Sequence, residues 1–213
     1  MIKINKKSDQ LIIVVHEIYG INQHIVDFCE LLSEQNFDVI CPNLLDQETP
    51  FHYSQEEDAY RNFMNNVGFR NGLHKVKNIL VANQDAYSKI FIIGFSVGAT
   101  LAWLSSEEEC IDGIVGYYGS RIRDYVNINP KCRALLFFPK EEKSFKVDEF
   151  VSKLHKPNID VHKCNGEHGF SDPYSIKYNE KSAQHALKET LHLNLYCVQI
   201  ENGLVRLNGA IVL

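Results

Sequence analysis

The sequence predicts an α/β protein built on a doubly wound, mostly parallel sheet that is flanked by helices. Short apolar runs rich in β-branched residues recur along the chain, as in strands that are buried on both faces. Segments of helical length separate these runs, and strands that alternate with helices form parallel sheets through crossover connections. The chain of 213 residues has no evident linker or repeat, so we expect one main domain with a sizeable core.

The first half of the chain supplies the first three expected strands. Residues 11–15 read LIIVV, and the helix that follows places Ile25, Phe28 and Leu32 on one face. Pro42 ends the next apolar run, because proline cannot donate a hydrogen bond within a sheet. In order, we expect a strand at 11–15, a helix at 24–35, a strand at 37–41, helices at 55–67 and 70–85, and a strand at 89–94.

The second half continues this alternation and then departs from it. We expect a helix at 99–104, strands at 111–118 and 134–138, a helix at 146–154, a strand at 158–163 and an amphipathic helix at 182–196. Two Asn-Gly pairs then stand between short apolar runs, which is typical of β-turns. The sequence therefore predicts a domain over residues 1–196 and a β-like tail over residues 197–213.

Composition and charge argue against several classes of protein. The formal net charge of −5 argues against a nucleic-acid-binding protein, which needs a basic face. No apolar run reaches membrane-spanning length and no signal peptide is recognisable, so we expect a cytoplasmic protein without membrane contact. The six cysteines are scattered without a C-x-x-C pair, which indicates reduced, packed thiols. As a partner we expect only a small-molecule substrate, and the chain is expected to be a monomer or a homodimer.

Residues 90–102 are the most informative stretch, because an apolar strand leads into G-x-S-x-G and then into an apolar helix. In that context the motif predicts a nucleophile elbow, with Ser96 on a sharp turn at the tip of the strand. Gly94 and Gly98 are expected because a Cβ at either position would crowd the adjacent strand or helix. The serine would face a cleft near the positive end of the helix. A strand–helix turn without chemistry is the alternative interpretation.

A nucleophilic serine needs a base, and the base needs an acid that holds its tautomer. In α/β-hydrolases the acid and then the histidine follow the serine along the chain. His168 stands in NGEHGF, a loop with flanking glycines just after the expected strand at 158–163, and is the expected base. His162 lies within that strand, while His185 and His192 lie on the last helix, so we expect structural roles for these three.

The acid should follow the strand at 134–138, on the loop PKEEKS. Glu141 and Glu142 are both available there, and we place Glu142 ahead of Glu141. The alternative is that this loop is a solvated cluster of charges.

The oxyanion hole should be built from backbone N–H groups of two loops. One N–H normally comes from the residue after the nucleophile and the other from the loop after the first long strand, which assigns them to Val97 and Ile18. The latter loop begins with His16 and Glu17. This is not an H-E-x-x-H motif, so zinc is not implied.

These motifs together resemble the dienelactone hydrolase family. The matching pieces are VHEIYGIN at 15–22, FDVICPNL at 37–44, GFSVG at 94–98, GYYG at 116–119 and HGF at 168–170, within a span of about residues 10–195. The resemblance implies a minimal α/β-hydrolase without a large cap domain. It implies hydrolysis of small esters or lactones through a covalent acyl-enzyme, with no cofactor and no metal.

The chain departs from the family pattern at four places. Ser96 replaces the cysteine nucleophile of the family's lactonases, and Glu142 stands where the family has an aspartate. Glu17 matches a glutamate that contacts that cysteine, so here it is either vestigial or orients Tyr60 or a water. The fourth departure concerns the two arginines that grip the substrate carboxylate, whose places are taken by two acids, Glu56 and Asp172.

Two acids in those places should repel an anionic substrate, because like charges about 4 Å apart cost roughly 4 kcal/mol at an effective dielectric of 20. We therefore expect turnover of neutral or cationic esters and rejection of anionic ones. Arg61 and Arg70 lie nearby in the sequence and could restore a positive pocket.

The resulting hypothesis is a cytoplasmic serine hydrolase in which Ser96 attacks, His168 is the base and Glu142 is the acid. Its rival is a non-catalytic α/β-hydrolase-like binding protein with a degenerate triad, which would not react with a fluorophosphonate. A third interpretation is an acyltransferase, which would keep the triad but exclude water.

Overall fold

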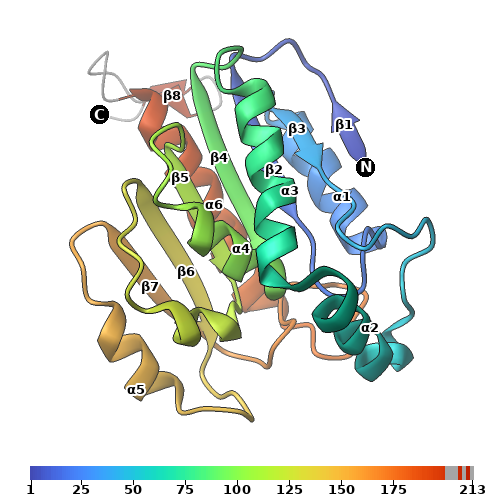
Figure 1. The fold of residues 1–213 in the computed structure, drawn as a ribbon. Helices are drawn as coiled ribbons and strands as arrows, with labels where there is room; N and C mark the ends of the chain where they lie inside the picture. Colours follow the sequence, from blue (N-terminus) through green and yellow to red (C-terminus); the bar gives the residue numbers. More distant parts are fainter. Residues whose placement is uncertain (200–205, 208–209, 212–213) are drawn as a thin grey trace.

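A seven-stranded sheet forms the centre of the molecule (Figure 1). The computed structural model describes residues 1–199, 206–207 and 210–211, and within them this sheet has the order β1-β3-β2-β4-β5-β6-β7. Its strands are β1 (Ile2–Ile4), β2 (Gln10–Val15), β3 (Asp38–Cys41), β4 (Lys89–Phe95), β5 (Gly113–Tyr117), β6 (Arg133–Pro139) and β7 (Ile159–Cys164). All neighbouring strands are parallel except β1, which is antiparallel to β3.

Helices cover both faces of the sheet, which confirms the doubly wound α/β class. They are α1 (Gln23–Glu34), α2 (Glu56–Asn62), α3 (Gly68–Asn83), α4 (Val97–Ser105), α5 (Val147–Val151) and α6 (Glu180–Gln199). Figure 1 shows α3 and α4 in front of the sheet and α6 behind it. Alternate residues of β2 enter the two cores, with Leu11 and Ile13 packing on the side of α3 and α4, and Ile12 and Val14 on the side of α1 and α6.

Three elements differ from the expectations. The strand β1 was not anticipated, because it is short and only alternate residues of it are partly buried. The helix expected at 55–67 is α-helical only in α2 and ends in a π-helical turn (Phe63–Val67), after which α3 begins at Gly68, whose φ of 65° separates the two, so two helices are present as expected. A short 3₁₀ helix at Ser120–Tyr125 follows β5 where no helix was expected.

The C-terminal segment agrees with the prediction only in part. The helix α6 continues to Gln199, so the first three residues of the expected β-like tail are helical. Beyond it, β8 (Arg206–Leu207) pairs antiparallel with β9 (Ala210–Ile211), as the second Asn-Gly pair suggests. The rest of the expected meander, at 200–205, 208–209 and 212–213, lies outside the described residues. Within the described part of the chain, no helix combines the length and apolar character needed to cross a membrane.

The strand order creates a crevice where the predicted site should lie. The chain passes from β2 to β3 on one side and then crosses to β4 on the other side of β2. At this point the strand order reverses, and the two connections run over opposite faces of the sheet. A crevice therefore forms at the carboxyl ends of the strands, which is where ligands bind in open α/β sheets. Here β2 ends at Val15 and β4 at Phe95, so the loop of Glu17 and Ile18 lies beside the G-x-S-x-G turn.

Candidate active site

The turn at Ser96 has the strained geometry of a nucleophile elbow. Ser96 lies between β4 and α4 with φ 52° and ψ −112°, a backbone conformation that residues other than glycine rarely adopt. A Cβ at position 94 would lie 2.2 Å from the carbonyl oxygen of Gly98. A Cβ at position 98 would lie 2.1 Å from the carbonyl oxygen of Val15. The expected reason for both glycines is therefore confirmed, since each allows a close approach of backbone to backbone.

Ser96, His168 and Glu142 form one chain of hydrogen bonds. The Ser96 Oγ lies 2.9 Å from the Nε2 of His168, and the Nδ1 of His168 lies 2.7 Å from the Oε1 of Glu142. A carboxylate only accepts hydrogen bonds, so Nδ1 carries the proton and Nε2 accepts from the serine hydroxyl. The Glu142 side chain is 9% exposed, whereas Glu141 is an exposed residue that no hydrogen bond ties to His168.

The loops that carry His168 and Glu142 are anchored to the ends of the sheet. His168 follows β7 between Gly166 and Gly169, which have φ values of 105° and 95° that favour glycine. Its imidazole packs against the Tyr118 ring with centroids 5.0 Å apart. Glu142 follows β6 and forms an isolated antiparallel bridge with Phe145, which closes the loop into a tight turn. Rigid neighbours of this kind fix the positions of the His168 and Glu142 side chains relative to each other.

The loop after β2 is held by a buried neutral histidine. Burial lowers the pKa of His16 to about 4, and the Leu44 N–H donates to its Nε2 at 2.9 Å. Its Nδ1 must then carry the proton, and it donates to the Glu17 carbonyl at 2.6 Å. This bond sits directly before Ile18, one of the two residues assigned to the oxyanion hole.

The N–H groups of Ile18 and Val97 are available for a ligand. Val97 is the first residue of α4, so its N–H has no partner within the helix. In the described residues, the Ile18 N–H donates no hydrogen bond to backbone or side chain. Both residues border the same cleft as Ser96.

The cleft above Ser96 has a volume of about 740 Å³ and carries charges of both signs. Its lining comprises Ile18, Glu56, Tyr60, Ser96, Val97, Ser120, Arg121, Arg123, Glu141, Glu142, Lys143, Ser144, Glu167, His168 and Lys177. The volume is in the range that holds small organic ligands. The cations among these residues are as numerous as the acids, so the cleft as a whole does not present a negative field.

The residues expected to contact substrate lie in two different places. Tyr60 and Glu56 line the cleft, and Glu56 is paired with Lys177 at 3.4 Å. Asp172 and Glu17 are instead buried, at 1% and 4% exposure, and border a smaller cavity of about 50 Å³ that Ser96 and His168 also line. Lys177 compensates the charge of Glu56, which weakens the expected repulsion of anions, while the part expected of Asp172 stays a prediction.

Three side chains near the site were not identified from the sequence. Arg121 donates to the Tyr60 hydroxyl at 3.2 Å and lines the cleft, whereas Arg61 and Arg70, which could have restored a positive pocket, are not among the lining residues. Lys177 is the counter-charge of Glu56. His24 lies between the buried carboxylates of Glu17 and Asp172. Of the three, only Arg121 could have been identified from the sequence, because it follows the carboxyl end of β5.

The other histidines lie apart from the reacting atoms. The Nδ1 of His162 and the Nε2 of His185 lie 3.3 Å apart, on β7 and α6. His192 lies 3.9 Å from Glu189 on α6. None of the three borders the cleft of Ser96.

The chain is similar to known proteins over nearly its whole length. The model of the dienelactone hydrolase family matches residues 2–194. Protein YczH of Bacillus subtilis (strain 168) is 38% identical over 172 residues, which cover 79% of this chain and 84% of that protein. Carboxymethylenebutenolidase 1 of Cupriavidus pinatubonensis is 23% identical over 201 residues, or 87% of this chain and 86% of the enzyme.

A solved structure supports the same fold. The crystal structure of a candidate dienelactone hydrolase from Klebsiella pneumoniae superposes with a TM-score of 0.72 at 20% identity, covering 86% of this chain and 85% of the other. The family model spans the G-x-S-x-G turn and all seven strands of the main sheet. The chain therefore belongs to the dienelactone hydrolase family.

Proposed function

We propose that this protein is a serine hydrolase that cleaves small carboxylic esters, lactones or thioesters through an acyl-enzyme. The observation that carries the proposal is the chain of two hydrogen bonds from Ser96 to His168 and from His168 to Glu142, at 2.9 and 2.7 Å. Membership of a hydrolase family supports it further.

In this mechanism Ser96 Oγ attacks the carbonyl carbon while its proton passes to Nε2 of His168. Glu142 keeps the other proton on Nδ1 and stabilises the imidazolium that forms. The N–H groups of Val97 and Ile18 stabilise the oxyanion of the tetrahedral intermediate. His168 then protonates the leaving oxygen or sulfur as it departs, which leaves the acyl group on Ser96.

The second half of the cycle repeats the same proton transfers with water. His168 removes a proton from a water molecule that attacks the acyl carbon, and then returns that proton to Ser96 as the acid product leaves. The half-exposed imidazole, with 30% of its side chain accessible, can be reached by water from the cleft. This access favours hydrolysis over transfer to another acceptor.

The cleft supports a small substrate with polar groups near the reacting carbonyl. Its lining includes Tyr60, whose hydroxyl accepts from Arg121, and Glu56, which is paired with Lys177. A paired acid repels an anion less than a free one, so we propose that the enzyme accepts both neutral and anionic small esters.

A fluorophosphonate probe tests the nucleophile directly. We expect wild-type protein to be labelled at Ser96 and Ser96→Ala to be unlabelled, while Ser120→Ala, which removes another serine of the same cleft, keeps the label. Hydrolysis of a panel of p-nitrophenyl esters and lactones should follow the same pattern. An unlabelled wild-type protein that hydrolyses none of the panel would support the non-catalytic alternative.

A further inference from the structure

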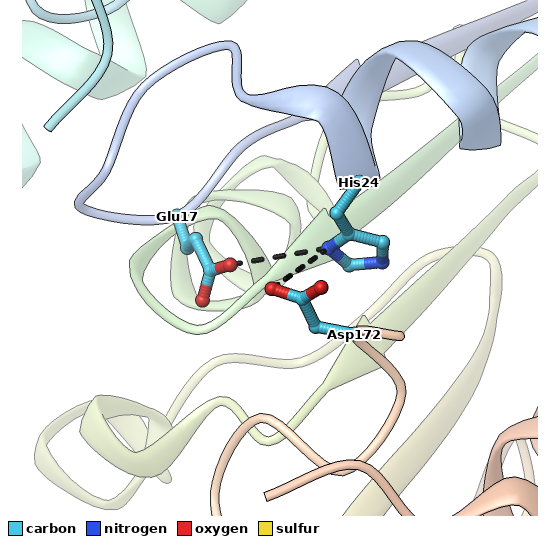
Figure 2. Close-up of side chains that lie close together, drawn as sticks. All are labelled: Glu17, His24 and Asp172. Atoms are coloured by element: carbon cyan, nitrogen blue, oxygen red, sulfur yellow. Dashed lines mark ion pairs between the residues drawn. The ribbon is translucent and has the colours of Figure 1, made fainter. Parts of the chain in front are cut away.

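Three side chains that are typical metal ligands meet near Ser96, and two of them border a cavity that Ser96 also lines. Glu17 comes from the loop after β2, His24 from the start of α1, and Asp172 from the loop after His168. Figure 2 shows the two carboxylates directed at the Nδ1 of His24, which lies 3.9 Å from the Oε1 of Glu17 and 3.8 Å from the Oδ2 of Asp172. All three residues are at least 96% buried.

The hydrogen bonds around this cluster leave two buried atoms without partners. Asp172 is satisfied by the Tyr53 hydroxyl at 2.6 Å and by the Tyr174 N–H at 2.9 Å. Among the described residues, the Oε1 of Glu17 and the Nδ1 of His24 have no hydrogen-bond partner. Buried polar atoms nearly always form hydrogen bonds in folded proteins, because an unpaired atom loses its bonds to water and gains none in exchange.

A proton on His24 would not resolve this arrangement by itself. Separations of 3.8 and 3.9 Å exceed hydrogen-bond length, so an imidazolium could attract both carboxylates without bonding to either. Two carboxylates and one imidazolium would also leave one net negative charge in a buried site. A divalent cation held between the three side chains would supply a partner for both orphaned atoms.

We propose that Glu17, His24 and Asp172 bind a divalent transition-metal ion, with Zn²⁺ as the preferred occupant. One imidazole nitrogen and two carboxylate oxygens are a donor set suited to Zn²⁺, and the three ligand atoms lie within 4.8 Å of one another. The site goes beyond the proposed hydrolase activity, because the steps described for Ser96 do not require it.

The spacing favours tetrahedral coordination. Zinc bonds of about 2.0–2.2 Å place tetrahedral ligand atoms roughly 3.4 Å apart, so the Nδ1 of His24 needs to approach each carboxylate oxygen by only about 0.5 Å. All three ligand atoms lie within 4.8 Å of one another. The smaller cavity of about 50 Å³ borders Glu17 and Asp172 and has room for a water as the fourth ligand. The Tyr53 hydroxyl would orient the Asp172 carboxylate from outside, as partners of metal ligands commonly do.

The position of the site suggests what the ion would do. Glu17 and His24 come from neighbouring segments near the start of the chain, whereas Asp172 comes from near its other end, and the segments of Glu17 and Asp172 also carry Ile18 and His168. A bound ion would clamp the oxyanion loop to the histidine loop. Because the unfolded chain lacks this arrangement, binding should stabilise the fold.

Cobalt titration of the chelator-treated protein tests the site without any activity measurement. We expect one Co²⁺ per chain, with intense visible absorption bands of a tetrahedral ion, and displacement by one equivalent of Zn²⁺. At roughly a hundredfold excess over the dissociation constant, the ion should raise the Tm by about 5–10 °C. Ser96→Ala should bind the metal equally well, so failure of the hydrolase proposal would leave this result unchanged.

Two kinds of variant separate this site from adventitious binding. His24→Gln and Asp172→Asn should each lose the cobalt bands, with folding checked by circular dichroism. His162→Gln removes the exposed His162–His185 pair, which could chelate a metal by chance, and should keep the bands. Absence of 1:1 binding in the wild type, or loss of the bands in His162→Gln but not in His24→Gln, would overturn the proposal. If His24→Gln does not fold, Glu17→Gln decides in its place.

Discussion

Replacing Glu142 by Gln changes a single atom of the proposed triad and tests its most specific feature. In the wild type, Nδ1 of His168 donates to a carboxylate oxygen at 2.7 Å, and this carboxylate is largely shielded from water. A glutamine amide can instead donate to Nδ1. The imidazole proton would then sit on Nε2, which faces Ser96 and could no longer accept the serine proton.

The expected magnitude follows from comparing two variants. Glu142→Ala removes a hydrogen bond to a charged group, worth about 1.5–3 kcal/mol, so kcat should fall by roughly 10–10²-fold. Glu142→Gln in addition favours the wrong tautomer of His168, so kcat should fall by on the order of 10⁴-fold, which corresponds to an activation free energy higher by about 5.5 kcal/mol. The glutamine variant should therefore be slower than the alanine variant by about 10²–10³-fold.

The assay is steady-state hydrolysis of p-nitrophenyl acetate, with the rate of fluorophosphonate labelling as a second readout. Glu141→Gln is the matched control on the same loop and should retain wild-type kcat within a factor of about two, because its exposed side chain has no bond to His168. The tautomer argument would be refuted if Glu142→Gln were no slower than Glu142→Ala. A strong loss in Glu141→Gln alone would transfer the acid role to that residue.

Three further predictions concern the backbone, the cleft and the core. Ser96→Gly should be about 1 kcal/mol more stable than Ser96→Ala in urea unfolding, because a φ of 52° strains any residue with a Cβ; equal stabilities would count against strain at the elbow. Glu56→Gln frees Lys177 and should raise kcat/KM for an anionic ester over its neutral analogue by about fivefold at low salt, since a half-exposed ion pair is worth at most about 1 kcal/mol; an unchanged ratio would place the substrate elsewhere in the cleft. Burial raises the pKa of Cys164 to about 11, so its thiol is almost wholly protonated at pH 8. Iodoacetamide should therefore modify it only after denaturation, which peptide mass spectrometry would detect. Rapid labelling of the native protein below pH 9 would contradict this.

The alternation of the fold and the local form of the elbow follow from the sequence. Runs such as LIIVV are short, apolar at every position and rich in β-branched residues, and this combination favours a strand covered on both faces, as β2 is. Gly94 and Gly98 are readable because their constraint is local, set by backbone atoms that any strand–turn–helix unit brings close. His168 is readable as well, since its loop follows the seventh strand in the order expected after a nucleophilic serine. The short strand β1 lacks such a pattern, because an edge strand needs only one partly covered face.

Side-chain partners between distant loops were decided only by the tertiary structure. The sequence places Glu142 ahead of Glu141 without a contact to support the choice, and the turn closed by Phe145 determines which carboxylate reaches the imidazole. Asp172 looks like a substrate contact by its spacing from His168, yet Tyr53, 119 residues away in the chain, binds it in the interior. Sequence patterns report periodicity over a few residues. Which charges are buried or paired depends on contacts between distant segments. Periodicity within each segment does not show which segments will meet.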